Sequence, residues 1–465
     1  MRIVGLVLSL AVAFAAAATA TAQERPLQPH QQQARQIFER LISFRSAAGQ
    51  GQVPAMASYI ADTLRAGGVP AEDIVTIPHQ ETVAMLVRVP GRDPAARPIL
   101  FSGHMDVVDA RPEDWQRSPF TLVEENGYFF GRGTLDNKAG IAAMTSAILR
   151  MRAANHRPAR TLVFAFVGDE ETGMATTRLV AAHDWVRNAE YAINTDAGGG
   201  LTGPDGRPMI YLIQGAEKTY ASFRLTLTNP GGHSSRPRAD NAIYELAQAL
   251  VRLQQHRFPV SSNALTRSYL GAVGRTVPGP TGEALRRFAA NPDDAEAAEA
   301  LSREAEFVGT TRTTCVATML EAGHAENALP QRASAVVNCR IFPGVSVDSV
   351  RATLAEVVAN PAITIETIGT PQESPASEPR EDVFAAIGRA VHAVHPGVPV
   401  TGYLESGGTD GLVYRAAGIP TWASSGVFIR PDEMFAHGLN ERIPVASFYQ
   451  GLDHIHALAR ELGGR

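Results

Sequence analysis

Three consecutive carboxylates, Asp169, Glu170 and Glu171, follow an apolar run that ends at Val167. Carboxylates this close repel one another unless a cation neutralises them, and a short apolar run before them is consistent with a buried strand. Taken alone, an acidic triplet is more often a solvated surface turn. It becomes a candidate metal-binding element only if other parts of the chain supply further ligands.

Two other strand-like runs also end in side chains that bind metals. Residues 98–101 lead into His104, and Asp106 lies two positions later, so both side chains point the same way on an extended backbone. In that geometry a carboxylate can orient a histidine ligand. Residues 191–195 lead into Asp196, which three glycines follow. Because sites assemble at strand ends in α/β sheets, this repetition favours one shared centre.

Two further candidates lie outside these runs. Glycines on both sides of Asp136 allow the backbone to turn tightly and to place the carboxylate at the start of a helix. A plain helix cap is the alternative role for this aspartate. The other candidate, His437, lies near the C-terminal end of the chain.

The candidate ligands comprise two imidazoles and three carboxylates: His104, Asp136, Glu171, Asp196 and His437. This set suits zinc, with cobalt or manganese as alternatives, better than calcium or copper. Five groups are too many for one tetrahedral site with an open position. They are the right number for two metal ions that share one bridging carboxylate, a centre that activates water for hydrolysis.

The helices and strands that must position these side chains are predicted to form an α/β fold. Two domains are expected, because a chain of 465 residues is too long for one ordinary hydrophobic core. A catalytic domain is predicted over 23–214 and 373–465, starting with a helical pattern over 35–64. Between its two parts, residues 215–372 read strand, helix, strand, strand, helix, strand, the ferredoxin-like order. This inserted lid carries a helical insertion at about 258–311.

Composition limits the partners and the compartment. A net charge of −5 argues against nucleic acid or an anionic membrane as the main partner. Residues 1–22 have a charged start, an apolar core and a small-residue end, which predicts a cleaved secretory signal rather than a membrane anchor. The mature protein is therefore expected to be secreted or periplasmic, and not membrane-bound.

The chain has two cysteines, Cys315 and Cys339, which lie in strand-like runs expected to pair antiparallel. The pairing places the two cysteines roughly opposite each other. In an oxidising compartment they could be bridged, and two buried free thiols are the equal alternative.

Six motifs together resemble a known family. In chain order they are SGHMDVV, GRGTLDNKAG, GDEETG, NTDAGGG, GGHSSRP and FAHGLNE. They are similar to motifs of the di-zinc peptidase and amidohydrolase family that includes glutamate carboxypeptidase, carboxypeptidase S, aminoacylase and succinyl-diaminopimelate desuccinylase. The resemblance covers nearly the whole mature chain. It implies a zinc-exopeptidase-like αβα catalytic domain with an inserted lid of the dimerisation type.

The resemblance also implies a role for each matching metal ligand. Asp136 would bridge two zinc ions, and a cis peptide bond would follow it. His104 and Asp196 would complete one ion. Glu171 and His437 would complete the other.

The remaining site residues would act on the substrate or support the ligands. By the same resemblance, Asp106 would orient His104, and Glu170 would be the general base. His233 on the lid would donate to the oxyanion, and in dimeric relatives the neighbouring subunit supplies this histidine. The predicted substrate-binding residues are Asn327, Arg340, Gly407 and Gly408.

The leading hypothesis is an exported zinc-dependent hydrolase of amide bonds in small peptides or N-acyl amino acids, with a carboxypeptidase-like preference for a free carboxylate. One alternative is an N-acyl amino acid deacylase. Another is a catalytically inactive metal- or ligand-binding protein on the same scaffold, against which the presence of Glu170 argues. A homodimer through the lid is one assembly that the resemblance allows, and the sequence leaves the oligomeric state open.

Overall fold

A computed structural model describes residues 26–464, so the predicted signal at 1–22 lies outside the described residues. The larger part is built on a mixed ten-stranded sheet in the order β1-β2-β6-β3-β7-β17-β9-β8-β18, with β16 paired to β9. Its strands are β1 (Ile74–His79), β2 (Thr82–Val89), β3 (Ile99–His104), β6 (Leu162–Val167), β7 (Tyr191–Asn194), β8 (Gly199–Thr202), β9 (Pro208–Glu217), β16 (Val400–Glu405), β17 (Thr421–Ala423) and β18 (Phe428–Ile429).

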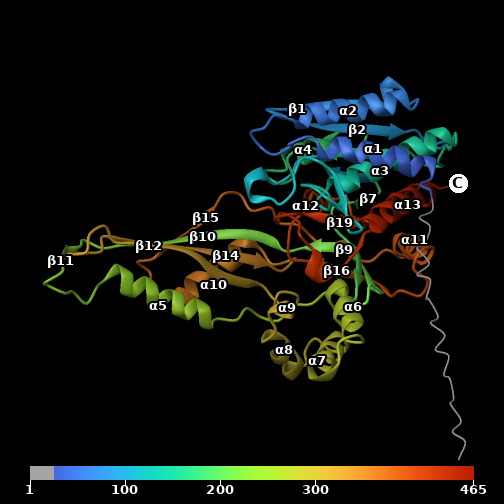
Figure 1. Cartoon of the computed structure of the whole chain (residues 1–465). Coiled ribbons are helices and arrows are strands. Elements are labelled where there is room, and N and C mark those ends of the chain that lie inside the picture. Colours follow the sequence, from blue (N-terminus) through green and yellow to red (C-terminus); the bar gives the residue numbers. More distant parts are fainter. Residues whose placement is uncertain (1–25, 465) are drawn as a thin grey trace, which may run out of the picture.

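Helices cover both faces of this sheet, which gives the predicted αβα layers (Figure 1). One face carries α1 (Pro29–Ile42), α2 (Val53–Ala66), α3 (Lys138–Ala153), α11 (Glu381–His392) and α13 (Val445–Leu462). The other carries α4 (Ala175–Ala182) and α12 (Gly411–Ala416). Strands β3 and β6 are buried along their whole length because helices lie on both sides, which explains their continuous apolar runs.

The helical pattern predicted over residues 35–64 is wrong as a single element. The structure has two helices, α1 and α2, separated by a loop over 43–52. Gly49 and Gly51 in this loop adopt φ angles of 76° and 62°, a left-handed conformation that glycine reaches without a steric penalty. Both helices bury an apolar face in the same core, so their patterns merge when the sequence is read without the turn.

The lid has the predicted ferredoxin-like order of elements. Its sheet runs β12-β14-β10-β15, and α5 and α10 pack on it in one apolar core. The elements are β10 (Thr219–Thr228), α5 (Ala242–Gln255), β12 (Thr314–Ala322), β14 (Arg332–Ile341), α10 (Val347–Val358) and β15 (Thr364–Ile368). The lid extends away from the larger sheet (Figure 1), and the chain crosses between β9 and β10 at Lys218.

The predicted helical insertion lies between α5 and β12. It consists of α6 (Ala264–Val273), α7 (Gly279–Ala290), α8 (Ala295–Ser302) and α9 (Ala305–Val308). Leu270, Leu285 and Phe288 form a core of its own, and α6 packs against β16 of the larger sheet. The insertion therefore contacts the catalytic sheet as well as the lid that carries it.

The remaining short elements complete the frame. A three-stranded sheet joins β4 (Val123–Glu125), β5 (Tyr128–Phe130) and β19 (Arg442–Pro444), and η1 (Ala71–Asp73), η2 (Pro112–Asp114) and η3 (Pro431–Glu433) are short turns of 3-10 helix. The pair β11 (Gly232–His233) and β13 (Ala328–Leu329) forms the far tip of the lid. Within residues 26–464, no helix has the length and apolar character required to cross a membrane.

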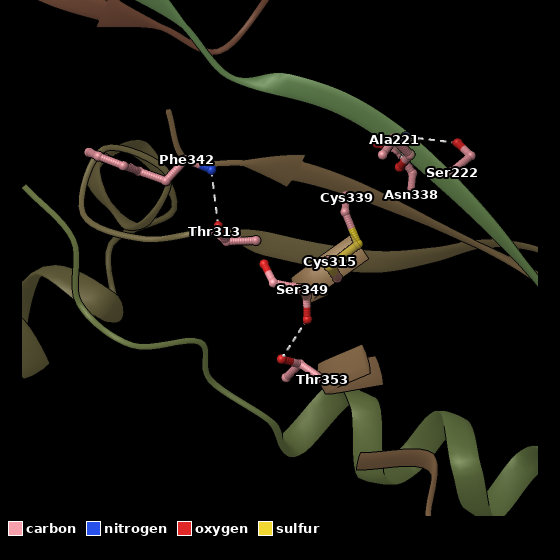
Figure 2. The surroundings of a disulfide bond; sticks show 9 residues. All are labelled: Ala221, Ser222, Thr313, Cys315, Asn338, Cys339, Phe342, Ser349 and Thr353. Atoms are coloured by element: carbon pink, nitrogen blue, oxygen red, sulfur yellow. Dashed lines mark hydrogen bonds between the residues drawn. A yellow bond between two sulfur atoms is a disulfide. The ribbon is translucent and has the colours of Figure 1, made fainter. Parts of the chain in front are cut away.

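The two cysteines form a disulfide, which settles the question that their spacing left open (Figure 2). Cys315 on β12 and Cys339 on β14 are direct partners in the antiparallel register. The bridge lies in the lid core. Nearby, the backbone N–H of Phe342 donates to the Thr313 hydroxyl at 3.0 Å, and Asn338 Nδ2 donates to the Ser222 hydroxyl at 3.1 Å.

Candidate metal centre

The ends of three parallel strands bring the predicted ligands to one edge of the large sheet. β3 pairs in parallel with both β6 and β7. His104 is the last residue of β3, Glu171 lies four residues beyond β6, and Asp196 lies two residues beyond β7. The apolar runs read from the sequence therefore end at a common edge, as parallel strands require.

All five predicted ligands meet there. His104 Nε2 lies 2.8 Å from Asp136 Oδ1 and 3.2 Å from Asp196 Oδ1. His437 Nε2 lies 3.0 Å from Asp136 Oδ2 and 3.0 Å from Glu171 Oε1. Asp136 thus stands between the two imidazoles and directs one carboxylate oxygen to each, which is the arrangement expected of a bridging ligand.

The donor set fits a divalent metal centre. In two overlapping groups, His104 with Asp136 and Glu171, and His104 with Glu170 and Asp196, the ligand atoms lie within 4.8 Å of one another. Burial, with the charge of a neighbouring carboxylate, raises the pKa of Glu170 and of Asp196 well above the ordinary range. Cations at this centre would offset that repulsion, and nitrogen and oxygen donors of this kind suit zinc.

Asp106 supports two ligand-bearing segments at once. His104 Nδ1 is 2.9 Å from the backbone oxygen of Asp106 and 3.5 Å from its carboxylate. The same carboxylate accepts hydrogen bonds from the backbone N–H groups of Glu170 and Glu171, at 3.1 and 3.0 Å. The sequence pattern indicated only the contact with His104, whereas the structure adds a direct link to the acidic loop.

The first acid of the triplet has a structural role. Asp169 is buried and accepts hydrogen bonds from the backbone N–H groups of Ala175 and Thr176, at 2.7 and 2.9 Å, at the start of α4. A carboxylate in this position satisfies helix N–H groups that otherwise lack partners. Asp169 thereby fixes the conformation of the loop that directs Glu170 and Glu171 toward the centre.

The peptide bond between Asp136 and Asn137 is cis, as the resemblance implied. Asn137 Nδ2 donates to the backbone oxygen of Thr195 at 3.0 Å, and the Thr195 hydroxyl donates to Asn137 Oδ1 at 3.0 Å. Two glycines near Asp136 are needed for different structural reasons. Gly133 has a φ of 88°, whereas Gly140 lies inside α3, where a Cβ atom would clash with Thr195. Of these two glycines, only Gly133 is required by the backbone turn before Asp136.

Glu441 is a residue of the site that the sequence analysis did not assign. It is fully buried, and its carboxylate accepts hydrogen bonds from the backbone N–H groups of Gly133, Leu135 and Asp136, at 3.1, 2.8 and 3.0 Å. Arg132, also buried, pairs with it at 2.7 Å. Glu441 thus holds the loop that presents the bridging aspartate. Its position four residues after His437 was visible in the sequence, but no local pattern shows a contact with residues 300 positions earlier.

We expect Glu441→Gln to weaken metal binding and turnover by about 10- to 100-fold, the usual effect of losing a group that supports metal ligands. The amide cannot accept all the hydrogen bonds of the carboxylate, and it leaves Arg132 without its buried partner. Zinc titration of the metal-free protein would measure the loss. Glu433→Gln is the matched control, because Glu433 pairs with Tyr128 near the same loop and contacts no metal ligand. Equal zinc affinities in both variants would contradict this role.

Arg340 contacts the loop that carries Gly407 and Gly408. Arg340 Nη1 donates to the backbone oxygen of Ser406 at 3.0 Å, and its guanidinium lies 4.8 Å from the centre of the Tyr220 ring. Within residues 26–464, Arg340 forms no ion pair with a carboxylate. Arg340 is held instead against the loop that carries the two glycines.

A buried network anchors the end of this loop. Glu217 accepts hydrogen bonds from the backbone N–H and the hydroxyl of Thr409, at 3.1 and 2.6 Å. Arg415 pairs with Glu217 at 2.7 Å, and Asn194 Nδ2 donates to the Thr409 hydroxyl at 3.1 Å. The next residue, Asp410, is buried, which raises its pKa to about 7. The loop that carries Gly407 and Gly408 is therefore tied to β7 and β9.

His233 and Asn327 are not brought to the centre. Both are exposed at the β11–β13 tip, where the backbone N–H of Ser234 donates to the backbone oxygen of Asn327 at 3.1 Å. His233 Nδ1 contacts the Ser235 hydroxyl at 2.8 Å. The tip is the part of the lid farthest from the large sheet (Figure 1). Within one chain, neither residue contacts the candidate ligands.

A cluster of imidazoles and carboxylates at the carboxyl edge of an α/β sheet, with a lid inserted between two parts of the sheet domain, defines a class of metal-dependent hydrolases. The chain belongs to the peptidase family M20/M25/M40, whose family model matches residues 100–461. The family resemblance of the six motifs is thereby confirmed.

Relatives of this family differ in activity. The chain is 28% identical over 379 residues to the N-fatty-acyl-amino acid synthase/hydrolase PM20D1 of Homo sapiens, a match covering 79% of this chain and 74% of the relative. It is 27% identical over 394 residues to a probable carboxypeptidase S-like protein of Dictyostelium discoideum, covering 80% and 72%. Aminoacylase-1B of Rattus norvegicus is 24% identical, with 90% and 92% covered.

Solved structures show the same fold. The M20 family metallo-carboxypeptidase Sso-CP2 from Sulfolobus solfataricus has a TM-score of 0.69 at 19% identity, covering 94% of this chain and all of that one. The Bacillus subtilis YXEP protein, a dinuclear metal-binding peptidase of the M20 family, has a TM-score of 0.60 at 13% identity, covering 93% and 98%. These matches confirm the αβα domain with its inserted lid.

Proposed function

We propose that this M20 hydrolase is a di-zinc enzyme that cleaves the amide bond joining an acyl or peptidyl group to an amino acid with a free carboxylate. The position of Glu170 carries the proposal. Its carboxylate reaches within 4.8 Å of ligand atoms of His104 and Asp196, while Glu171 faces His437 on the other side of Asp136. A protein that only bound metal would not need this additional carboxylate.

In the proposed hydrolysis, the residues of the site have different roles. When bound, the two zinc ions would lower the pKa of a water molecule and polarise the carbonyl oxygen of the substrate. Glu170 would take the proton of the attacking water and deliver it to the nitrogen of the leaving amine. Asp106 keeps the Glu170 backbone in place through the hydrogen bond described above.

Arg340 supports a substrate with a free carboxylate. A guanidinium held by a backbone oxygen and an aromatic ring still has donors available for a planar bidentate contact. The Gly407–Gly408 segment beside it offers backbone without side chains, so that a substrate can approach closely.

We expect Arg340→Gln to raise KM by about 10-fold or more for substrates with a free C-terminal carboxylate, because a hydrogen bond to a charged group contributes roughly 1.5–3 kcal/mol. The same substrates with an amidated C-terminus provide the control and should be affected little. Steady-state kinetics on the matched pair would measure the difference. An equal loss on both substrates would indicate that Arg340 supports the loop rather than the substrate.

The first experiment on the proposed function is to measure metal content by mass spectrometry together with hydrolysis of dipeptides and N-acyl amino acids before and after chelation. About two zinc ions per chain and chelator-sensitive release of a C-terminal amino acid support the proposal. One metal or none, with no turnover after zinc or cobalt is restored, would favour the inactive binding protein.

An N-acyl amino acid deacylase is the second candidate, and the relatives named N-fatty-acyl-amino acid synthase/hydrolase and aminoacylase favour it. Exposed apolar side chains flank the candidate ligand His437, at Met434 and Leu439. An apolar rim suits an acyl chain better than a charged peptide. The ratio of kcat/KM for N-acyl amino acids of increasing chain length to that for dipeptides would separate the two candidates.

We further propose a homodimer in which the lid tip of one chain supplies His233 to the centre of the other. Two observations support it. His233 is exposed and far from its own centre, and β12, an edge strand of the lid sheet, exposes Val316, Met319 and Leu320. Paired edge strands would cover this apolar surface. Light scattering should give twice the monomer mass, and mixing His233→Ala with Glu170→Gln chains should partly restore activity. A monomer with full activity would contradict the proposal.

We also propose that the protein is exported through the predicted signal at residues 1–22. The disulfide between Cys315 and Cys339 supports an oxidising compartment, where such bonds persist. Cell fractionation with an antibody would test the location, and a cytoplasmic protein that keeps residues 1–22 would contradict it.

A further inference from the structure

A small cavity lies where the insertion joins the lid, apart from the metal centre. Its volume is about 110 Å³, and the ends of α5, α8 and α9, the start of β12 and one side chain of α10 line it. At about 30 Å³ per water molecule, this is room for roughly four waters, or for one small oxyanion. Its lining contains two arginines and a histidine, and no carboxylate.

Arg312 is the charged side chain of this cavity that is most deeply buried. Only 7% of the residue is exposed. Its Nη1 donates to the backbone oxygen of Phe258 at 3.3 Å, and its Nε has no partner. Burial, together with the positive charge of Arg257, lowers the pKa of Arg312. A buried guanidinium without a paired carboxylate is unfavourable, so an anion bound beside Arg312 would stabilise it.

The nearest carboxylate is already engaged elsewhere. Glu299 accepts hydrogen bonds from Arg257 at 2.6 Å and from Arg303 at 3.2 Å, and it does not pair with Arg312. Arg257 and Arg312 therefore leave an excess of positive charge at the cavity.

His256 supplies a second buried donor. Its Nε2 atom is inaccessible to solvent and has no hydrogen-bond partner, and its ring packs edge-on against Phe258 at 4.9 Å. His256 and Arg312 both line the cavity, and each carries one buried ring or guanidinium nitrogen that has no hydrogen-bond partner. The Ser302 hydroxyl, which also lines the cavity, accepts a hydrogen bond from Arg257 at 3.0 Å. These side chains come from the C-terminal end of α5, from α8 and from the segment just before β12.

We propose that this cavity is a binding site for a small tetrahedral oxyanion, phosphate or sulfate, held by Arg312 and His256. The charge, the unpartnered N–H groups and the volume all match such a ligand, and buried guanidinium groups bind oxyanions strongly. The backbone oxygen of Arg312 also accepts a hydrogen bond from Lys218 Nζ at 2.8 Å. Since Lys218 is the crossing point between β9 and β10, a bound anion would brace the insertion, the lid and the crossing together.

Calorimetric titration of the mature zinc-loaded protein with sulfate and with phosphate, at constant ionic strength set by chloride, tests the site. We expect saturable binding of one anion per chain. Arg312→Gln and His256→Leu should each weaken it about tenfold or more. Arg303→Gln is the matched control, because Arg303 is exposed, pairs with the same Glu299 and does not line the cavity. Binding that is equal in all four proteins, or absent from the parent, would overturn the proposal.

Phosphate can also reach the zinc ions, so the position of the anion needs its own measurement. A crystal of the parent protein grown with selenate would locate selenium by its anomalous scattering. A peak between Arg312 and His256 supports the site, and it does so even if the Arg312 variant fails to fold. Selenate at the metal centre alone would overturn it. Neither result depends on the proposed hydrolytic activity.

Discussion

Glu170→Gln is expected to lower kcat by about 10²- to 10⁴-fold, the usual contribution of a positioned general base, while zinc content stays near that of the parent protein. The amide has almost the same shape as the carboxylate but cannot accept the proton of the attacking water. The backbone N–H of residue 170 still donates to Asp106, so the loop keeps its position. Steady-state kinetics and mass spectrometry on the same preparations would measure both quantities.

The control for Glu170 is Glu72→Gln, on the exposed surface turn η1. It removes the same charge without touching the centre and should leave kcat unchanged. Full turnover by Glu170→Gln would exclude the general-base role. A fall in turnover that only accompanied a loss of zinc would make Glu170 a metal ligand instead.

Asp136→Asn is expected to have the largest effect on the metal centre. The two carboxylate oxygens of Asp136 face His104 at 2.8 Å and His437 at 3.0 Å, so this one side chain links both halves of the ligand set. An amide offers one oxygen in place of two. We expect zinc content to fall from about two to one or fewer per chain, and kcat/KM to fall by on the order of 10³-fold or more.

Asp184→Asn is the matched control for Asp136, because its side chain is 81% exposed and pairs only with Arg187 in the next turn. Zinc content, kcat/KM and the unfolding temperature should be compared across the three proteins. An Asp136→Asn protein that retained two zinc ions would contradict the bridging assignment and would place the link between the ions on another carboxylate.

The sequence predicted three of the five ligands from local patterns that can be read without knowing the fold, whereas the roles of Asp136 and His437 came from the resemblance of their motifs. His104, Glu171 and Asp196 follow apolar runs, and parallel strands with such runs must end at one edge. The lid was predictable for the same reason, since its strands and helices alternate in a known order. The break between α1 and α2 was missed, because two helices that share a core have nearly the same periodicity as one long helix.

The supporting residues could not be predicted in this way. Glu441 holds the backbone of a loop about 300 positions earlier, and Asp169 directs its side chain to the start of α4 while its two acidic neighbours face the centre. The Glu217 and Arg415 pair joins β9 to α12 inside the protein. Each of these contacts depends on the packing of segments that are distant in the sequence. Such packing produces no local pattern of polar and apolar residues.

By itself, therefore, the sequence determined the family, the layers of the fold and the residue types available for a metal centre, because these follow from local patterns of polarity and from motif order. Tertiary structure alone decided that Asp136 lies between the two imidazoles, that Cys315 and Cys339 are bridged, and that His233 lies away from its own centre. The physical reason is that distances between segments are set by how whole elements pack. A side chain's type gives its possible chemistry, and only its neighbours in space select among the possibilities.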